Sequence, residues 1–144
     1  MNKKLKIVLL ILFVLFAGAA VVWKIVNKPT RDYHDSKPEM SFNFDELMKK
    51  IETDTAALRN KLIAVNGQIT KITRDSGSFR LEIGYDSIMS SVTCDVDARY
   101  VSEMGGVSEG KPVDIKGIVS EVTVDPESSF GNTVALIYCT LNKK

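Results

Sequence analysis

The sequence contains few of the residues from which enzymes build active sites. Among its 144 residues there is one histidine, His34, and there are two cysteines, Cys94 and Cys139. Nucleophilic catalysis by cysteine or serine needs a base beside the nucleophile, and no such constellation is visible here. Two cysteines with no histidine nearby are too few for a structural zinc site, and no phosphate-cradling glycine loop is present. We therefore expect no catalytic residue, no metal and no cofactor.

A basic charge balance is also missing. The formal net charge is +1, but five of the nineteen basic residues precede residue 30, and no acidic residue does. Residues 30–144 thus carry fourteen basic and eighteen acidic side chains, a net charge of −4. This is the wrong sign for a domain that binds a phosphate backbone, and it argues against nucleic acid as the partner.

Residues 1–26 contain the longest apolar run. Residues 7–23 are uncharged and are flanked by lysines on both sides, and Ile25 and Val26 extend the run. A helix of about 20 such residues spans a hydrocarbon core of ~30 Å. A cleaved signal peptide is the alternative, since residues 17–20 are small enough for a cleavage site. We favour a retained anchor, because the apolar residues continue beyond that site.

Basic residues indicate the orientation of this anchor. Lys3, Lys4 and Lys6 precede the apolar run, which predicts that the short N-terminal tail stays in the cytoplasm. The expected location is therefore the inner (cytoplasmic) membrane, with a single pass and an extracytoplasmic C-terminal domain. No cysteine in this stretch could carry a lipid.

Residues 27–40 are expected to form a linker. They contain Pro29 and Pro38 with alternating charges and show no apolar periodicity. The single histidine, His34, lies in this segment and is expected to be a solvated side chain.

Residues 41–60 are expected to hold an amphipathic helix that packs on the following domain. Its apolar positions from about Phe44 to Leu58 form one stripe, and Ser41 or Asn43 is a suitable N-cap. Residues 53–55 have low helix propensity, so the helix is expected to bend or break there.

From residue 61 onward the pattern is that of β-strands. Two strands share a central glycine, Gly67 or Gly117, with apolar residues two before, two after and five after it. The alternation therefore slips by one residue after each glycine, as a β-bulge produces. Three more alternating stretches and a short helical segment after the third strand complete the pattern. The mainly β chain is thus predicted to form a five-stranded OB-fold Greek-key barrel over residues 61–144.

Several stretches resemble the tRNA_anti-like family. They include Val65-Asn66-Gly67 and the runs VTCDV at 92–96, GKPVDIKG at 110–117 and LIYCTL at 136–141. The resemblance implies a small bacterial OB-fold protein that is membrane-anchored or secreted. These motifs belong to a fold and not to an active site, so the resemblance implies no substrate.

Cys94 and Cys139 lie on the third and fifth predicted strands, which are neighbours in an OB barrel. In an extracytoplasmic domain they could form a disulfide, closing a loop of about 45 residues and adding roughly 3 to 4 kcal/mol. The alternative is a pair of buried thiols that never oxidise. The sequence leaves both open.

OB domains bind ligands across their second and third strands and the adjoining loops. Lys71, Arg74, Arg80 and Phe130 are the candidate residues of this binding face. Acidic residues are interspersed with them, and the exposed aromatic residues that stack on bases are scarce. We therefore predict a membrane-anchored extracytoplasmic binding or adaptor module that contacts an envelope protein or a small ligand. The alternative is a single-stranded nucleic-acid-binding OB domain of the anticodon-binding type.

Overall fold

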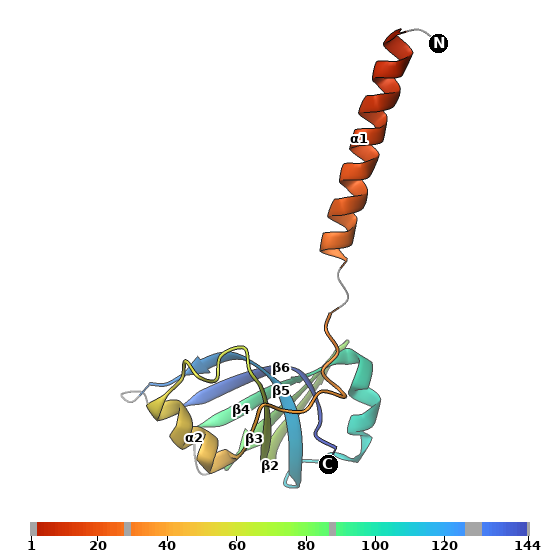
Figure 1. Cartoon of the computed structure of the whole chain (residues 1–144). Coiled ribbons are helices and arrows are strands. Elements are labelled where there is room, and N and C mark those ends of the chain that lie inside the picture. The colour runs from red at the N-terminus through yellow and green to blue at the C-terminus, as the bar shows by residue number, and fades with distance from the viewer. Residues whose placement is uncertain (1–2, 28–29, 87–88, 126–130, 144) are drawn as a thin grey trace. The chain divides into compact units, whose positions relative to one another are not determined.

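The computed structural model describes residues 3–27, 30–86, 89–125 and 131–143. The chain consists of two compact units, Met1–Arg31 and Asp32–Lys144 (Figure 1). The described residues of the first unit contain one helix, α1 (Lys3–Val26). Its segment Ile7–Val26 is long and apolar enough to cross a membrane, and its described side chains are exposed. This agrees with an anchor or a signal segment, as the apolar run predicts.

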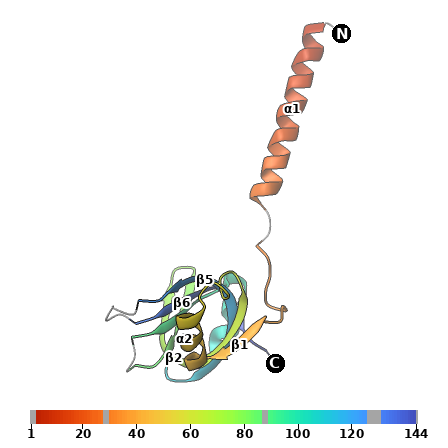
Figure 2. The same cartoon turned by 60° about the vertical axis from the view of Figure 1, so that its left-hand side comes forward.

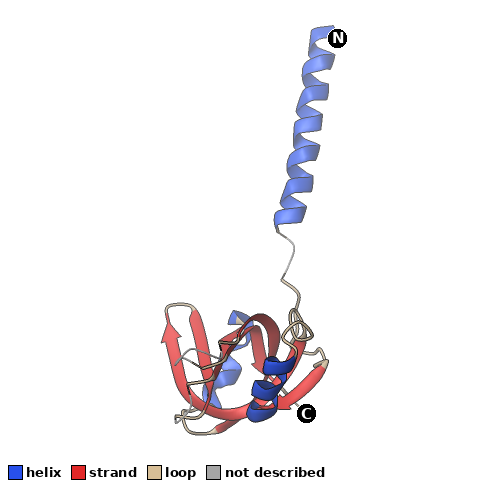
Figure 3. Cartoon of the chain, turned by 90° about the vertical axis from the view of Figure 1, so that its left-hand side faces the viewer, coloured by secondary structure: helices blue, strands red, loops and turns tan. Residues whose placement is uncertain are grey.

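The second unit is built around a closed barrel. Its strands are β2 (Leu62–Asp75), β3 (Ser78–Gly84), β4 (Ser91–Val96), β5 (Pro112–Thr123) and β6 (Thr133–Leu141). The order is β2-β3-β4-β6-β5, and β5 pairs back onto β2, which closes the sheet. A short 3₁₀ helix, η1 (Ala98–Gly106), connects β4 and β5. The predicted five-stranded barrel with a helical segment after its third strand is confirmed (Figure 3).

Both glycine-centred strands contain the bulge that their spacing predicts. The register of β2 against β3 shifts at Thr70, three residues after Gly67. The register of β5 against β6 shifts at Ser120, three residues after Gly117. In each strand the extra residue turns the following apolar side chain back toward the core.

The two glycines are also required by the packing of the walls. A Cβ atom on Gly67 would collide with the side chain of Ile83. A Cβ atom on Gly117 would lie 2.6 Å from Cys139 Sγ and 3.1 Å from the carbonyl oxygen of Ile137. Facing strands therefore approach each other at positions where only glycine fits.

A sixth strand, β1 (Met40–Asn43), lies where the linker and the cap were expected (Figure 2). It pairs in parallel with the first half of β2, with Met40 opposite Ile63. Its four residues are too few for an alternating pattern to be recognised in the sequence.

The helix α2 (Phe44–Thr53) follows β1 directly. Asn43 is its N-cap, as predicted: the Asn43 side chain accepts from the Glu46 amide at 2.8 Å, and the Glu46 carboxylate accepts from the Asn43 amide at 3.0 Å. The buried face of α2 consists of Phe44, Leu47, Met48 and Ile51.

The predicted break of this helix at residues 53–55 is confirmed, and its continuation to Leu58 is wrong. The helix ends at Thr53, within the weak stretch, and Asp54 is the C-cap residue. The Asp54 carboxylate instead accepts from the Ala57 amide at 3.1 Å and starts a turn. Leu58 is nevertheless fully buried, because this turn places its side chain in the core.

The expectation that His34 is solvated is also wrong. Its side chain is only 17% exposed, and its ring stacks on Tyr100 with the centroids 4.2 Å apart. Its two ring nitrogens reach the carboxylates of Asp35 and Glu103. The residues around His34 therefore pack against the barrel and do not form a free spacer.

We expect the replacement of Gly117 by alanine to destabilise the domain by about 1–3 kcal/mol, because the added methyl group forces Cys139 or the β6 backbone to move. Gly105→Ala is the matched control, since a Cβ atom there has no neighbour within 4 Å. Its effect should stay within about 0.5 kcal/mol. Urea unfolding of both variants measures the difference, and equal stabilities would contradict the close-packing argument.

Candidate functional site

The outward face of β3 and its neighbours holds two of the predicted binding residues. The register places Thr73, Arg80 and Asp95 in one row across β2, β3 and β4. The Arg80 guanidinium donates from Nε to Asp95 Oδ1 at 2.5 Å and from Nη2 to Oδ2 at 3.1 Å. This bidentate hydrogen bond raises the pKa of Arg80 above its ordinary value. Arg80 is therefore already engaged by a carboxylate of its own sheet.

Lys71 lies in the next row, directly opposite Glu82. Cross-strand neighbours of opposite charge lower each other's field at the surface. The two rows thus present alternating charges, and the face lacks the continuous basic groove that tracks a nucleic-acid backbone.

Arg74 does not share this face. It stands opposite Phe79, whose side chain is buried, so both residues belong to the inward-facing set at the end of the barrel. The Arg74 guanidinium carbon lies 5.1 Å from the centroid of the Phe79 ring, a cation–π contact. The structure therefore brings Lys71 and Arg80 together and separates Arg74 from them. Phe130 lies outside the described residues.

Two surface hollows meet at Arg74. The first, which we call the Arg74 hollow, has a volume of about 380 Å³ and is lined by Arg74, Asp75, Gly77, Ser78, Phe79, Ala98 and Val101. The second has a volume of about 570 Å³ and is lined by Ile72, Arg74, Val107, Ser108 and Glu109. Within the described ranges Arg74 forms no ion pair. A guanidinium with five donors is thus available between two concave, partly apolar surfaces.

The first turn of η1 forms one wall of the Arg74 hollow. Asp97 caps this turn: its Oδ1 atom accepts from the Arg99 amide at 3.0 Å and from Arg99 Nε at 2.9 Å. Arg99 Nη2 donates to the second carboxylate oxygen at 2.5 Å. The hydrogen bonds from the Arg99 guanidinium hold the pKa of the buried Asp97 below its ordinary value. This cap fixes the position from which Ala98 and Val101 reach the hollow.

Sequence reasoning missed the contribution of η1 to this surface. Asp97 was the signal in the sequence, since an aspartate directly before a short helical stretch is a typical N-cap. What the sequence could not show is that the turn between β2 and β3 lies against this helix and leaves a hollow between them.

Cys94 and Cys139 are fully buried free thiols on the neighbouring strands β4 and β6. Burial raises the pKa of the Cys139 thiol, and a hydrogen bond with Cys94 raises it further. The strand adjacency predicted for the pair is therefore present, while the disulfide stays a prediction.

One family model and several solved structures match this chain. The model of the tRNA_anti-like family matches residues 1–127. Among solved structures, a candidate nucleic acid-binding lipoprotein from Klebsiella pneumoniae is 18% identical, with a TM-score of 0.55, over 72% of this chain and 91% of its own. A candidate aspartyl-tRNA synthetase from Leishmania major is 10% identical, with a TM-score of 0.46, over 87% of this chain and 25% of its own. None of the curated proteins matches the chain. At these identities the likeness to solved structures shows the fold alone.

We expect Asp97→Asn to lower the free energy of unfolding at pH 7 by about 1.5–3 kcal/mol, the usual contribution of hydrogen bonds to a charged group. Because the folded-state pKa of Asp97 is lowered, its stabilisation is present above the unfolded pKa near 3.8 and is lost as the pH falls through the folded pKa. The difference between Asp97→Asn and the unsubstituted protein should therefore shrink from pH 7 to pH 3. Asp86→Asn, at an exposed turn position, is the control and should show no such change. A difference of the same size at both pH values would contradict the role of the charge.

The disulfide is tested by alkylating denatured, unreduced protein purified from the organism that makes it and measuring the mass of the product by mass spectrometry. A bridge between Cys94 and Cys139 gives no alkyl adduct until a reductant is added. Two adducts without reductant would show that the pair remains as thiols.

Proposed function

The chain belongs to the tRNA_anti-like family, and we propose that it is a membrane-anchored OB-fold binding module that holds an acidic segment of an envelope protein at the Arg74 hollow. The anchor is α1, whose 20-residue apolar segment has the length of a membrane span. The lysines that precede it favour a cytoplasmic tail and an extracytoplasmic barrel at the inner membrane. In this arrangement the barrel binds a partner and catalyses no reaction.

One observation carries the proposal: Arg74 is a cation without an ion-pair partner in the described part of the chain, and it stands between two hollows. Arg80, by contrast, is paired with Asp95. A carboxylate of the partner would accept hydrogen bonds from the Arg74 guanidinium. An apolar side chain beside that carboxylate would cover Phe79 and Val101. Arginine and aromatic residues are both enriched in protein interfaces, and arginine is common among the residues that contribute most of the binding energy.

The charge pattern favours a protein partner over single-stranded nucleic acid. On the outward face of β3, Arg80 pairs with Asp95 and Lys71 stands opposite Glu82, and the described residues of this face offer no aromatic platform. The likeness to the Klebsiella lipoprotein supports the fold of this chain and carries no argument about its ligand.

The proposal is tested by incorporating a photo-cross-linking residue at Ser78, in the wall of the Arg74 hollow, and recovering adducts from intact membranes. We expect Arg74→Gln to reduce the yield of the cross-linked partner about tenfold, because a charge-assisted hydrogen bond contributes roughly 1.5–3 kcal/mol. Arg80→Gln is the matched control and should leave the yield within about twofold, since Arg80 is engaged by Asp95. Equal yields from Arg74→Gln and the unsubstituted protein would exclude the Arg74 hollow as the site that binds the partner.

The nucleic-acid alternative predicts a different result from the same variants. A labelled single-stranded oligonucleotide would bind the detergent-solubilised full chain at low salt, and its affinity would fall steeply as salt is added. Binding of that kind, weakened by Arg80→Gln as much as by Arg74→Gln, would replace the protein partner with a nucleic acid.

A further inference from the structure

One edge of β2 has no neighbouring strand beyond the bulge. On its other edge, β2 pairs with β3 as far as Asp75. On this edge, β5 pairs with β2 only as far as Gln68, and the Ile69 amide then donates to the carbonyl oxygen of Lys111 at 3.0 Å. In the described part of the chain no strand pairs with this edge at residues 72–74, which we call the open edge of β2.

The register turns the backbone polar groups of the open edge away from β3. The Ile72 amide donates to a side chain, Glu109 Oε1, at 2.8 Å, so it faces away from the ladder with β3. In an antiparallel ladder every second residue directs its N–H and C=O groups to the same side. The backbone groups of Arg74 therefore face the open edge as well. Ile72 is partly buried and Arg74 is exposed, so solvent reaches this edge.

The second hollow at Arg74 lies beside the open edge. Its volume is about 570 Å³, and Ile72 and Arg74 of the edge form one part of its lining. The rest comes from residues 107–109, in the segment between η1 and β5. Extended peptides add to exposed strand edges, where main-chain hydrogen bonds provide affinity and side chains provide specificity. The hollow therefore provides space for an extended segment at an edge that has no strand of its own.

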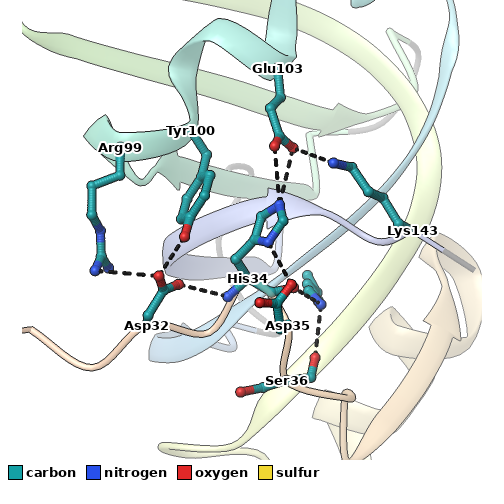
Figure 4. A network of polar contacts seen from close by, with 9 residues as sticks. Asp32, His34, Asp35, Ser36, Arg99, Tyr100, Glu103 and Lys143 are labelled. Carbon is teal, nitrogen blue, oxygen red and sulfur yellow. Dashed lines mark hydrogen bonds and ion pairs between the residues drawn. The ribbon is translucent and has the colours of Figure 1, made fainter.

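The segment that lines the far side of this hollow is held by η1. The Val107 amide donates to the carbonyl oxygen of Met104 at 3.2 Å, and the Met104 side chain is fully buried. Side chains of η1 bind the chain before β1, since the Tyr100 hydroxyl donates to Asp32 (Figure 4). A preformed surface loses less conformational entropy when it binds a partner. The hollow is thus suited to an extended ligand.

We propose that the partner's acidic segment binds as an extended strand that adds antiparallel to the open edge of β2. This inference rests on the proposed function and specifies how the segment is recognised. Antiparallel pairing is slightly more stable per residue than parallel pairing. Arg74 lines both hollows, so a strand on this edge leads from the second hollow toward the Arg74 hollow. The exposed Glu109 carboxylate holds the Ile72 amide until a carbonyl oxygen of the partner replaces it.

The open edge also predicts a side-chain pattern for the partner. Residues of the added strand that stand opposite Ile72 and Arg74 share the face of those two side chains. An apolar residue opposite Ile72 and an acidic residue opposite Arg74 match them, which places the two partner residues two positions apart. A second copy of this edge would instead bring two Arg74 guanidinium groups onto one face, and like charges there are unfavourable.

Strand addition is tested with a capped synthetic peptide, Val-Thr-Glu-Thr-Val, and the detergent-solubilised full chain. We expect the peptide to slow hydrogen exchange of the Arg74 amide, measured by NMR. Methylating the backbone nitrogen of the glutamate should weaken binding by at least about fivefold, because it removes the hydrogen bond to the Arg74 carbonyl oxygen and adds a clash. The matched control is the same peptide methylated at the nitrogen of its first threonine, which faces away from β2 and should change affinity less than about twofold.

Two results would overturn strand addition. The first is equal affinity of the two methylated peptides. The second is unchanged exchange of the Arg74 amide at millimolar peptide. Protection of this amide that rises with protein concentration in the absence of peptide would replace the partner with a second copy of the chain and overturn the proposal.

Substitution of Glu109 tests whether its carboxylate holds the place of the partner's carbonyl. Both Glu109→Ala and Glu109→Gln remove a charge that repels an acidic peptide, but glutamine keeps an oxygen that accepts from the Ile72 amide. Glu109→Ala should therefore tighten peptide binding more than Glu109→Gln does. Equal affinities of the two variants would overturn this role of Glu109.

The effect of Arg74→Gln separates this inference from the proposed function. We expect it to weaken binding of the unmethylated peptide about tenfold, because the charge-assisted hydrogen bond to the glutamate is lost. If it does so while the two methylated peptides bind equally, the acidic site stands and strand addition is overturned. If Arg74→Gln has no effect while the methylated peptides differ as expected, strand addition stands and the acidic partner is overturned.

Discussion

The structure depends on the closure of β2 onto both β3 and β5. A single strand can pair with two partners at its two halves only if it bends sharply between them, and Gly67 followed by the bulge at Thr70 provides that bend. Gly117 serves the opposite wall in the same way, by letting β6 approach with Cys139 directly against it. Side chains at either glycine would hold the walls apart. Closure thus relies on two positions without a Cβ atom.

Closure also determines which side chains reach the surface. Before the bulge of β2, odd-numbered residues such as Ile69 point inward; after it, the inward set is Ile72 and Arg74. Lys71 therefore joins Arg80 on the outside, and Arg74 is carried to the rim of the barrel. The bulge that shapes the wall therefore separates Lys71 and Arg80, which lie on a face of alternating charge, from Arg74 beside a hollow.

The sequence predicts the barrel because apolar alternation and its slip are local and periodic. The same spacing predicts the bulge at Thr70, but grouping Arg74 with Arg80 ignores the effect of that bulge on the residues that follow it. The capping asparagine before α2 is likewise readable from a few neighbouring residues. The contact between Lys116 and the carbonyl oxygen of His34 is not, because it joins residues 82 positions apart without any repeating pattern. The strand β1 is missed for a related reason, since four residues do not establish a period.

The same physical rule explains both Arg74 and Lys116. Most of the described cations that form close contacts are paired with a carboxylate, as Arg80 is with Asp95 and Arg99 with Asp97. Arg74 lies instead over an aromatic face, and Lys116 binds two backbone carbonyls. Neither arrangement neutralises the charge, so each cation keeps the capacity to gain from another acceptor. For Arg74, at an open surface, we propose that this acceptor comes from a partner. A domain whose residues 30–144 carry a net charge of −4 therefore retains local positive charge at the place where binding is proposed.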